Sequence, residues 1–264
     1  MSLKDVGRKI YQCIPAGTFR QYAAAWAYRR LHGAALTDCC VENGLFTVRT
    51  KDGVVVRTVV DFDPESLIAD FSMVPRDGVV MDVGGNIGAV AVYLAAKVGP
   101  AGRVIAYEPD EHNLAVFRRN LEANGSPAQV QLVPKGISDH EGTLEFFSGG
   151  NYTSSFQQTD YVQREVKKYN VVRIPVTTLD AEATRLNLTR LDFVKMDIEG
   201  SEVAALQGAP AVLRRFHPAI LVETHIVNGQ STAAEVERLL AEFGYRNIIR
   251  QTLTETPGIF ATPK

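Results

Sequence analysis

Val-Val-Met-Asp-Val-Gly-Gly-Asn-Ile-Gly, residues 79–88, is the stretch that decides the fold of this chain. An apolar strand runs into a glycine-rich turn there, and the turn opens a helix. A second apolar strand, residues 104–107, ends at Glu108. Glycines let the backbone approach a ligand closely, and the amides at a helix start favour a ligand carboxylate or phosphate. Because an acid at the second strand end can accept hydrogen bonds from ribose hydroxyls, the stretch predicts a nucleoside-containing cofactor.

The glycine spacing separates the candidate cofactors. A dinucleotide fingerprint needs glycines at relative positions one, three and six. The two reading frames of this turn place there Gly84, Asn86 and Ala89, or Val83, Gly85 and Gly88. Neither frame fits, so a nicotinamide cofactor is the second choice, and the Gly-Lys-Ser/Thr end of a P-loop is missing as well. What remains is the pattern Asp-x-Gly-x-Asn-x-Gly, beginning at Asp82.

The overall composition excludes several classes of protein. The chain has 264 residues and a formal net charge of −2, which suits one α/β domain with an appendage and gives no basic footprint for nucleic acid. Its three cysteines, Cys13, Cys39 and Cys40, match neither a zinc spacing nor a secreted disulfide framework. The sequence shows no secretory pattern and no membrane-length apolar run. We therefore expect a cytoplasmic protein without nucleic-acid or membrane partners.

From Val79 onward, apolar strands alternate with amphipathic helices, which predicts helices on both faces of a parallel sheet. We expect a doubly wound, mostly parallel α/β sheet of seven strands in a domain covering residues 63–264. The expected strands are residues 79–82, 104–107, 130–133, 191–196, 219–222, 245–249 and 259–262. Residues 1–62 are interpreted as an N-terminal cap that covers or shapes the cofactor cleft. Within it we expect a helix over residues 23–31 and a hairpin turning at the Asp-Gly pair of residues 52–53.

One stretch interrupts the alternation of strands and helices. Residues 142–147 and 171–176 are predicted as strands outside the main sheet. The long segment between them contains Gly-Gly-Asn-Tyr-Thr-Ser-Ser, residues 149–155. A loop of this length in a compact domain is often functional. Two interpretations stay open, a flap over the substrate side or an ordinary surface loop.

Acidic side chains gather at the ends of the predicted strands. Asp82 and Glu108 end the first two strands, and Asp197 and Glu223 end two later ones, with His225 close behind. Ligands of doubly wound folds bind at these carboxyl ends, near the switch in strand order. Since unpaired acids are costly to bury, their concentration at one edge of the sheet indicates a site.

The helix that follows Asp197 leaves three assignments open. Asp197 either faces the cleft or caps that helix, and we favour the cleft. Glu199 and Glu202 belong either to the site or to the solvent face. Further on, Thr232 with Glu235 predicts a capping box at the start of the last helix.

Five motifs carry a resemblance to a known family. They are Asp-Val-Gly-Gly-Asn-Ile-Gly from residue 82, Tyr-Glu-Pro-Asp from 107, Gly-Ile-Ser-Asp-His-Glu-Gly-Thr from 136, Val-Lys-Met-Asp-Ile-Glu-Gly-Ser-Glu from 194 and Leu-Val-Glu-Thr-His from 221. Over residues 79–245 the chain resembles the FkbM family of class I methyltransferases. The resemblance implies S-adenosylmethionine as cofactor. It also implies O-methylation of a hydroxyl on a sugar, a polyketide or another secondary metabolite.

The same resemblance implies roles for individual residues. Glu108, followed by Pro109, binds the ribose, and Gly136 and Ser138 lie near the adenine. Asp197 lies between cofactor and acceptor. The residues implied to hold the methionine part are Asp82, Gly84, Gly85, Asn86 and Gly88. The residues implied to face the acceptor are Asp197, Glu223 and His225.

Methyl transfer to a hydroxyl requires in-line alignment and a group that accepts the hydroxyl proton. His225 is the expected base because imidazole titrates near neutral pH, and Asp197 is the alternative. Some O-methyltransferases bind magnesium through an acid after the fourth strand and an acidic pair after the fifth. Here that pair would be Glu223 and Thr224, so we expect no metal, with a divalent cation as the alternative.

Other functions stay open at this stage. One is methylation of a nucleic acid or a protein, although the Asn-Pro-Pro-Tyr type of motif is absent after the fourth strand. Another is a cofactor-binding scaffold without catalysis. The sequence identifies neither the acceptor nor the oligomeric state, and a homo-oligomer is one of the open outcomes.

Overall fold

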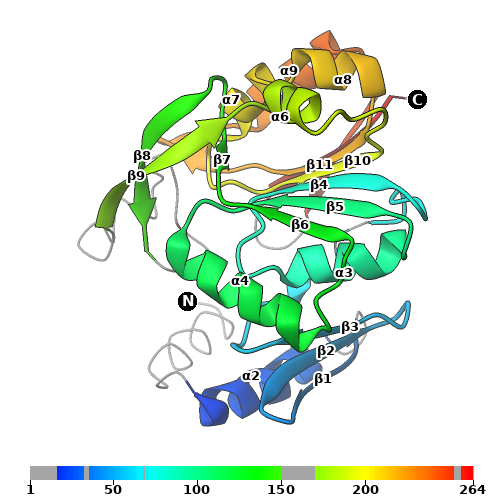
Figure 1. Ribbon diagram of the computed structural model, residues 1–264, viewed down its shortest axis with the longest axis vertical. Helices are drawn as coiled ribbons and strands as arrows, with labels where there is room; N and C mark the ends of the chain where they lie inside the picture. Colours follow the sequence, from blue (N-terminus) through cyan, green and yellow to red (C-terminus); the bar gives the residue numbers. More distant parts are fainter. Residues whose placement is uncertain are drawn as a thin grey trace.

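A central sheet of seven strands lies between two layers of helices (Figure 1). The structure is a computed structural model that describes residues 17–32, 36–67, 69, 71–149, 170–252 and 257–263. The strand order is β14-β15-β11-β10-β4-β5-β6. The predicted doubly wound α/β fold is therefore confirmed.

The strand order places a switch point at the centre of this sheet. The strands are β4 Val79–Val83, β5 Arg103–Tyr107, β6 Val130–Val133, β10 Phe193–Met196, β11 Ala219–Glu223, β14 Asn247–Thr252 and β15 Pro257–Thr262. All neighbours from β6 to β11 are parallel, and β15 is antiparallel to both of its neighbours. The chain proceeds outward from β4 to β6 and then crosses to β10 on the other side of β4. Ligands of open α/β sheets bind at the strand ends beside such a switch.

Helices cover both faces of the sheet, which explains why its central strands are apolar throughout. On one face lie α3 (Ala89–Val98) and α4 (Glu111–Ala123) (Figure 1). The helices on the other face are α6 (Leu179–Arg185), α7 (Glu202–Gln207), α8 (Pro210–Phe216) and α9 (Ala233–Glu242). Val80, Met81 and Val83 of β4 are accordingly all buried.

Two helix starts behave differently from each other. Asp110 caps α4 as predicted, because its carboxylate accepts a hydrogen bond from the His112 amide at 2.8 Å. The capping box predicted at Thr232 is wrong, since this side chain makes no cap hydrogen bond. The Thr232 hydroxyl donates instead to Glu202, 30 residues earlier in the chain.

The N-terminal region forms a helix and a small antiparallel sheet. Its elements are α2 Thr18–His32, β1 Leu36–Glu42, β2 Leu45–Thr50 and β3 Val55–Thr58, followed by the short helix η1 Pro64–Leu67. The predicted hairpin is confirmed as β2 and β3. The helix begins earlier than expected, and β1 was not predicted. The sheet packs on α4, where Asn120 and Asn124 accept hydrogen bonds from the amides of Val59 and Arg57.

The described part of the N-terminal region packs on the helix layer. Phe46 and Val56 of its sheet share one hydrophobic core cluster with Leu94 of α3. No described residue before Phe62 lines the pocket that lies at the strand ends. The described part of the region therefore supports the helix layer and does not cover the cleft. The division into residues 1–62 and 63–264 stays a prediction.

A third sheet lies beside the strand ends. It consists of β7 Gly136–Ile137, β8 Gly142–Ser148 and β9 Asn170–Thr177, in the order β7-β9-β8. The two strands predicted outside the main sheet, β8 and β9, are confirmed. The predicted flap falls mostly on residues 150–169, outside the described residues.

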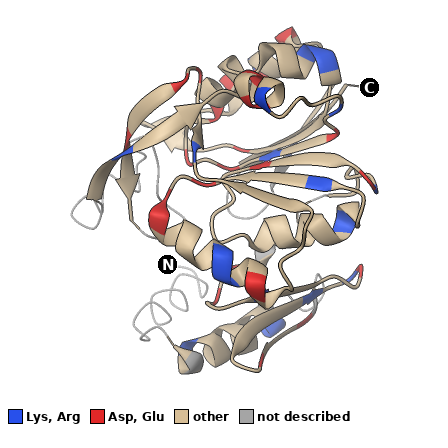
Figure 2. Cartoon of the chain, in the orientation of Figure 1, with Lys and Arg blue, Asp and Glu red and all other residues tan. Residues whose placement is uncertain are grey.

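The distribution of charge and the length of the helices complete the description. Figure 2 shows acidic and basic residues interspersed over the helices and strands that it colours by charge. Among the described residues, none of the helices has the length and apolar character needed to cross a bilayer.

Candidate active site

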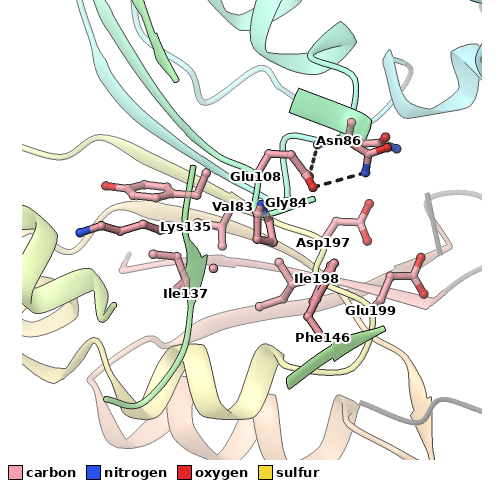
Figure 3. Close-up of a pocket in the computed structure, with 14 residues that line it drawn as sticks. Val83, Gly84, Asn86, Glu108, Lys135, Ile137, Phe146, Asp197, Ile198 and Glu199 are labelled. Atoms are coloured by element: carbon pink, nitrogen blue, oxygen red, sulfur yellow. Dashed lines mark hydrogen bonds between the residues drawn. The ribbon is translucent and has the colours of Figure 1, made fainter. Parts of the chain in front are cut away.

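A pocket lies at the carboxyl ends of β4, β5 and β10, beside the switch point (Figure 3). Its lining residues are Val83, Gly84, Asn86, Tyr107, Glu108, Pro109, Asn113, Lys135, Gly136, Ile137, Phe146, Asp197, Ile198 and Glu199. Six residues assigned from the sequence are among them: Gly84, Asn86, Glu108, Pro109, Gly136 and Asp197. The assigned residues outside the lining are Asp82, Gly85, Gly88, Ser138, Glu223 and His225.

The glycine turn is fixed by its neighbours. The amides of Gly84 and Gly85 donate to the carbonyl of Tyr107 at 3.0 and 2.9 Å, which ties the turn to the end of β5. Gly84 and Gly88 both have positive φ, +86° and +83°. A Cβ at Gly84 would lie 1.8 Å from the carbonyl oxygen of Asp197, and one at Gly88 would lie 2.2 Å from the Phe117 ring. Glycine is therefore required at these positions by packing as well as by backbone conformation.

Asp82 lies beneath this turn and is completely buried. Among the described residues its carboxylate oxygens have no hydrogen-bond partner, and the Lys195 ammonium is 3.7 Å away. Burial raises the pKa of Asp82 to about 6, against the opposing effect of Lys195. The Lys195 ammonium also donates to the Gly84 carbonyl at 3.2 Å and lies 3.5 Å from Asp197 Oδ2. Asp82 thus connects to the pocket through Lys195.

Glu108 is held with its carboxylate at the pocket, close to Asn86 (Figure 3). Its Oε2 accepts a hydrogen bond from the backbone amide of Asn86 at 2.7 Å, and its Oε1 accepts one from the backbone amide of Asp110 at 2.9 Å. Burial raises the pKa of Glu108 to about 7 despite these hydrogen bonds. Such a carboxylate retains acceptor capacity for the hydroxyls of a ribose.

Asn86 supplies a second fit to the expected cofactor. Its side-chain oxygen is buried and has no hydrogen-bond partner among the described residues. A buried acceptor without a donor is costly, and the ammonium of an amino-acid moiety would satisfy it. The residues present therefore fit an adenosyl amino acid with its ribose at Glu108 and its methionine part at the turn.

The wall of the pocket opposite the glycine turn, which we call the far wall, was only partly predicted from the sequence. Gly136 lines it, whereas Ser138 is buried and its hydroxyl donates to Asp139 at 3.2 Å. Lys135, Ile137 and Phe146 complete this wall. Phe146 was missed because β8 lies outside the main sheet, and the alternation of Leu144 and Phe146 about a polar residue was its local signal in the sequence.

The acidic cluster after β10 and β11 meets the pocket at Asp197 and Glu199. His225 Nε2 lies 3.7 Å from Asp197 Oδ1 and 3.7 Å from Glu199 Oε2. His225 Nδ1 lies 2.8 Å from Glu202 Oε1. Asp197, Glu223 and His225 offer one atom each within 4.8 Å of one another. The structure therefore brings together the three residues expected near the acceptor, and adds Glu199 and Glu202.

The carboxylates set the charge of His225. Burial acts to lower its pKa, but the hydrogen bond with Glu202 and the charges of Glu202, Glu199 and Asp197 raise it to about 10. The ring is accordingly a cation at neutral pH, with both nitrogens donating. Burial also raises the pKa of Glu199, a non-glycine residue with φ +51°. Strained backbone of this kind concentrates at functional sites.

Three atoms this close could hold a metal ion, but the protein supplies its own cations there. The Lys195 ammonium and the His225 imidazolium both lie within 4 Å of Asp197. An added divalent cation would compete with both of them for the same carboxylate. The expectation that no metal is used stays a prediction.

The strand order, the glycine turn and the acid at the end of β5 define a class I methyltransferase, the class whose cofactor is S-adenosylmethionine. Within that class, the methyltransferase FkbM domain matches residues 82–247, more than half of the chain. The chain belongs to the FkbM methyltransferase family, and the predicted family is confirmed.

Curated relatives agree with this assignment. The chain is 31% identical over 227 residues to AMB antimetabolite synthetase AmbE of Pseudomonas aeruginosa, covering 72% of this chain and 10% of AmbE. It is 29% identical to Methyltransferase 1 of Beauveria bassiana, covering 53% of this chain and 61% of that protein. It is 26% identical to Methyltransferase sdnD of Sordaria araneosa, covering 73% of this chain and 82% of that protein. The chain thus spans a tenth of the first relative and about three fifths of the second.

A solved structure named as methyltransferase FkbM from Methylobacillus flagellatus KT is also similar. It shares 19% sequence identity at a TM-score of 0.49, over 70% of this chain and 44% of that one.

Proposed function

We propose that this protein transfers a methyl group from S-adenosylmethionine to a hydroxyl oxygen of a small molecule. The observation that carries the proposal is the pairing of two walls in one pocket, Gly84, Asn86 and Glu108 on one side and the carboxylates of Asp197 and Glu199 on the other. The first wall suits the cofactor, and the second suits an acceptor that must lose a proton.

In this proposal the chain's own residues bind and orient. Glu108 accepts hydrogen bonds from the ribose hydroxyls, and Asn86 with the Gly84 turn holds the methionine part. The bound cofactor supplies an electrophilic methyl group, whose bond to sulfur breaks as its bond to the acceptor oxygen forms. Lys135, Gly136 and Phe146 supply the far wall, on the adenine side.

Asp197 accepts the proton of the acceptor hydroxyl in this proposal. It lines the pocket, whereas His225 and Glu223 stand behind it. His225, the base expected from the sequence, acts as a hydrogen-bond donor because it is already protonated at neutral pH. A base positioned within hydrogen-bond reach contributes about 10²–10⁴-fold to a rate.

A small acceptor is supported by the modest net charge of the chain and by the interspersed acidic and basic residues along the ribbon in Figure 2. Neither provides the basic patch typical of nucleic-acid substrates. Cys39 and Cys40 are free thiols, which suits the reducing cytoplasm that we propose as the location.

Two measurements test the proposal. Isothermal titration should show binding of S-adenosylhomocysteine but not of NAD. Incubation with labelled S-adenosylmethionine and a metabolite pool, followed by mass spectrometry, should show label in an alkali-stable methyl ether. Cofactor binding without turnover across a broad panel of hydroxyl acceptors would favour a scaffold. Label appearing in RNA or protein instead would contradict a small-molecule acceptor.

A further inference from the structure

Glu202 is a carboxylate that never reaches the pocket yet is completely buried. It is the first residue of α7, and three donors surround it. The Gly200 amide donates to Oε1 at 2.8 Å, His225 Nδ1 faces the same oxygen at 2.8 Å, and the Thr232 hydroxyl donates to Oε2 at 3.0 Å. Together these contacts engage both oxygens of the Glu202 carboxylate.

These contacts fix His225 at two points. The Thr232 hydroxyl oxygen, which is bound to Glu202 through its hydrogen, also accepts a hydrogen bond from the His225 amide at 3.1 Å. With the pKa of His225 raised, Nδ1 carries a proton and donates a hydrogen bond to Glu202 Oε1 at 2.8 Å. With Nδ1 engaged, the ring can only present Nε2 to the pocket side.

Among the described residues, charged groups from three segments surround the ring. Glu202 comes from α7, Asp197 and Glu199 from the segment after β10, and Glu223 from the end of β11. Lys195 is the neighbouring cation, on the far side of Asp197. The positive φ of Glu199 belongs to the same turn whose next amide, that of Gly200, binds Glu202. One short loop thus aims Glu199 into the pocket and holds the acid behind it.

We propose that Glu202 is a positioning residue that locks the His225 ring. In this arrangement the Nε2–H group of His225 points at Asp197 and Glu199 and holds these two pocket-lining carboxylates in place for the acceptor hydroxyl. The inference rests on the proposed function. The acceptor O–H proton passes to Asp197 as the oxygen bonds to the methyl carbon and the methyl–sulfur bond breaks. The imidazolium gives up no proton in this step and serves to keep Asp197 oriented.

The first test measures His225 directly and needs no turnover. Histidine ring resonances of the full chain are followed by NMR against pH, and His225 is assigned with a His225→Gln variant among the five histidines. In the unmodified protein, His225 should carry protons on both nitrogens at pH 7 and titrate well above 6.5, the usual value for histidine. In Glu202→Gln, which keeps the shape and removes the charge, the His225 midpoint should fall by about one to two pH units. Glu237→Gln, a surface carboxylate paired with Arg250, is the matched control and should leave it unchanged.

The second test reads the consequence for catalysis. Glu202→Gln should lower kcat about tenfold or more while leaving S-adenosylhomocysteine affinity within about twofold, because the cofactor wall is untouched. The alkaline limb of its kcat profile should move to lower pH, together with the His225 midpoint. If a neutral His225 acted as the base, Glu202→Gln would have the opposite effect. The acid limb of the kcat profile would move to lower pH, and the rate at neutral pH would rise.

The outcomes separate this inference from the proposed function. A His225 midpoint at or below 6.5 in the unmodified protein overturns the inference, even if Glu202→Gln does not fold. An unchanged midpoint in folded Glu202→Gln, or a lost rate without movement of the alkaline limb, also overturns it. If His225 behaves as expected but no hydroxyl compound is methylated, the proposed function fails while the positioning of His225 by Glu202 stands.

Discussion

The two walls of the pocket are built in different ways. On the cofactor wall, Gly84 and Gly85 bind the backbone of Tyr107, and Glu108 binds backbone amides within 22 residues of it. On the acceptor wall, the determining contacts join side chains, and Glu202 binds His225 and Thr232 across 23 and 30 residues. The first wall is held mainly by hydrogen bonds to backbone groups, which most side-chain substitutions leave in place, and the second depends on a few side chains.

This difference predicts how the walls respond to change. Substitutions that move backbone should damage cofactor binding, and substitutions of acceptor-wall side chains should damage turnover at unchanged cofactor affinity. The walls also touch, since Gly84 abuts the carbonyl of Asp197 and Lys195 contacts both. The strongest tests are therefore made at that contact.

Gly84→Ala should have the largest effect. Its Cβ would lie 1.8 Å from the Asp197 carbonyl oxygen, in addition to the cost of φ +86°. We expect S-adenosylhomocysteine binding to be lost in isothermal titration and the free energy of unfolding to fall by about 1–3 kcal/mol. Gly125→Ala is the control, because it has φ +77° and nothing within 4 Å of the added carbon. If both variants bind S-adenosylhomocysteine equally well, the close approach of Gly84 to the Asp197 carbonyl is irrelevant to cofactor binding.

Asp82→Ala and Asp197→Asn should separate the two walls. Asp82→Ala leaves the Lys195 ammonium without its partner beneath the turn, and we expect cofactor affinity to be abolished. Asp197→Asn should keep that affinity within about twofold and lower turnover by about 10²–10⁴-fold. Thermal melting must first show that both variants are folded. Equal cofactor affinities for the two would remove the distinction between the walls.

The cofactor wall should also respond to pH through Glu108. Burial raises its pKa from 4.5 to about 7, and ribose hydroxyls favour its ionised form. Affinity for S-adenosylhomocysteine should thus be constant above pH 8 and fall about tenfold by pH 6, with proton release on binding. Because the folded protein binds the Glu108 proton more tightly than the unfolded chain does, the free energy of unfolding of the unliganded protein should fall as the pH rises from 4.5 to about 7. In Glu108→Gln the part of the pH dependence centred near pH 7 should be lost, and any dependence that remains should be centred near pH 6, where Asp82 titrates.

Metal removal should have the smallest effect on either wall. Lys195 and the protonated His225 already neutralise Asp197, so treatment with EDTA should leave kcat unchanged. Activity abolished by EDTA and restored by magnesium would instead assign Asp197, Glu223 and His225 to a cation.

The same contrast explains what the sequence could and could not predict. The turn, both acids near it and the strands of the central sheet follow from local patterns, because each is made within a short segment. Thr232 was predicted to cap a helix from its neighbours alone, yet its hydroxyl binds Glu202. Glu199 and Glu202 were undecided because their contacts with His225 join side chains of two separate segments, and no local pattern encodes such a pairing. The placement of the N-terminal sheet on α4, away from the cleft, also depends on tertiary packing that no local pattern specifies.

Over the described residues, the small sheet of β7, β8 and β9 shares no strand pairing with the central sheet, yet it contributes Phe146 and Gly136 to the pocket. Its exposed and partly exposed positions are not constrained by the backbone contact that joins Gly84 to Asp197. Substitutions at those positions should therefore alter the adenine side of the pocket while leaving the contact between Gly84 and Asp197 in place.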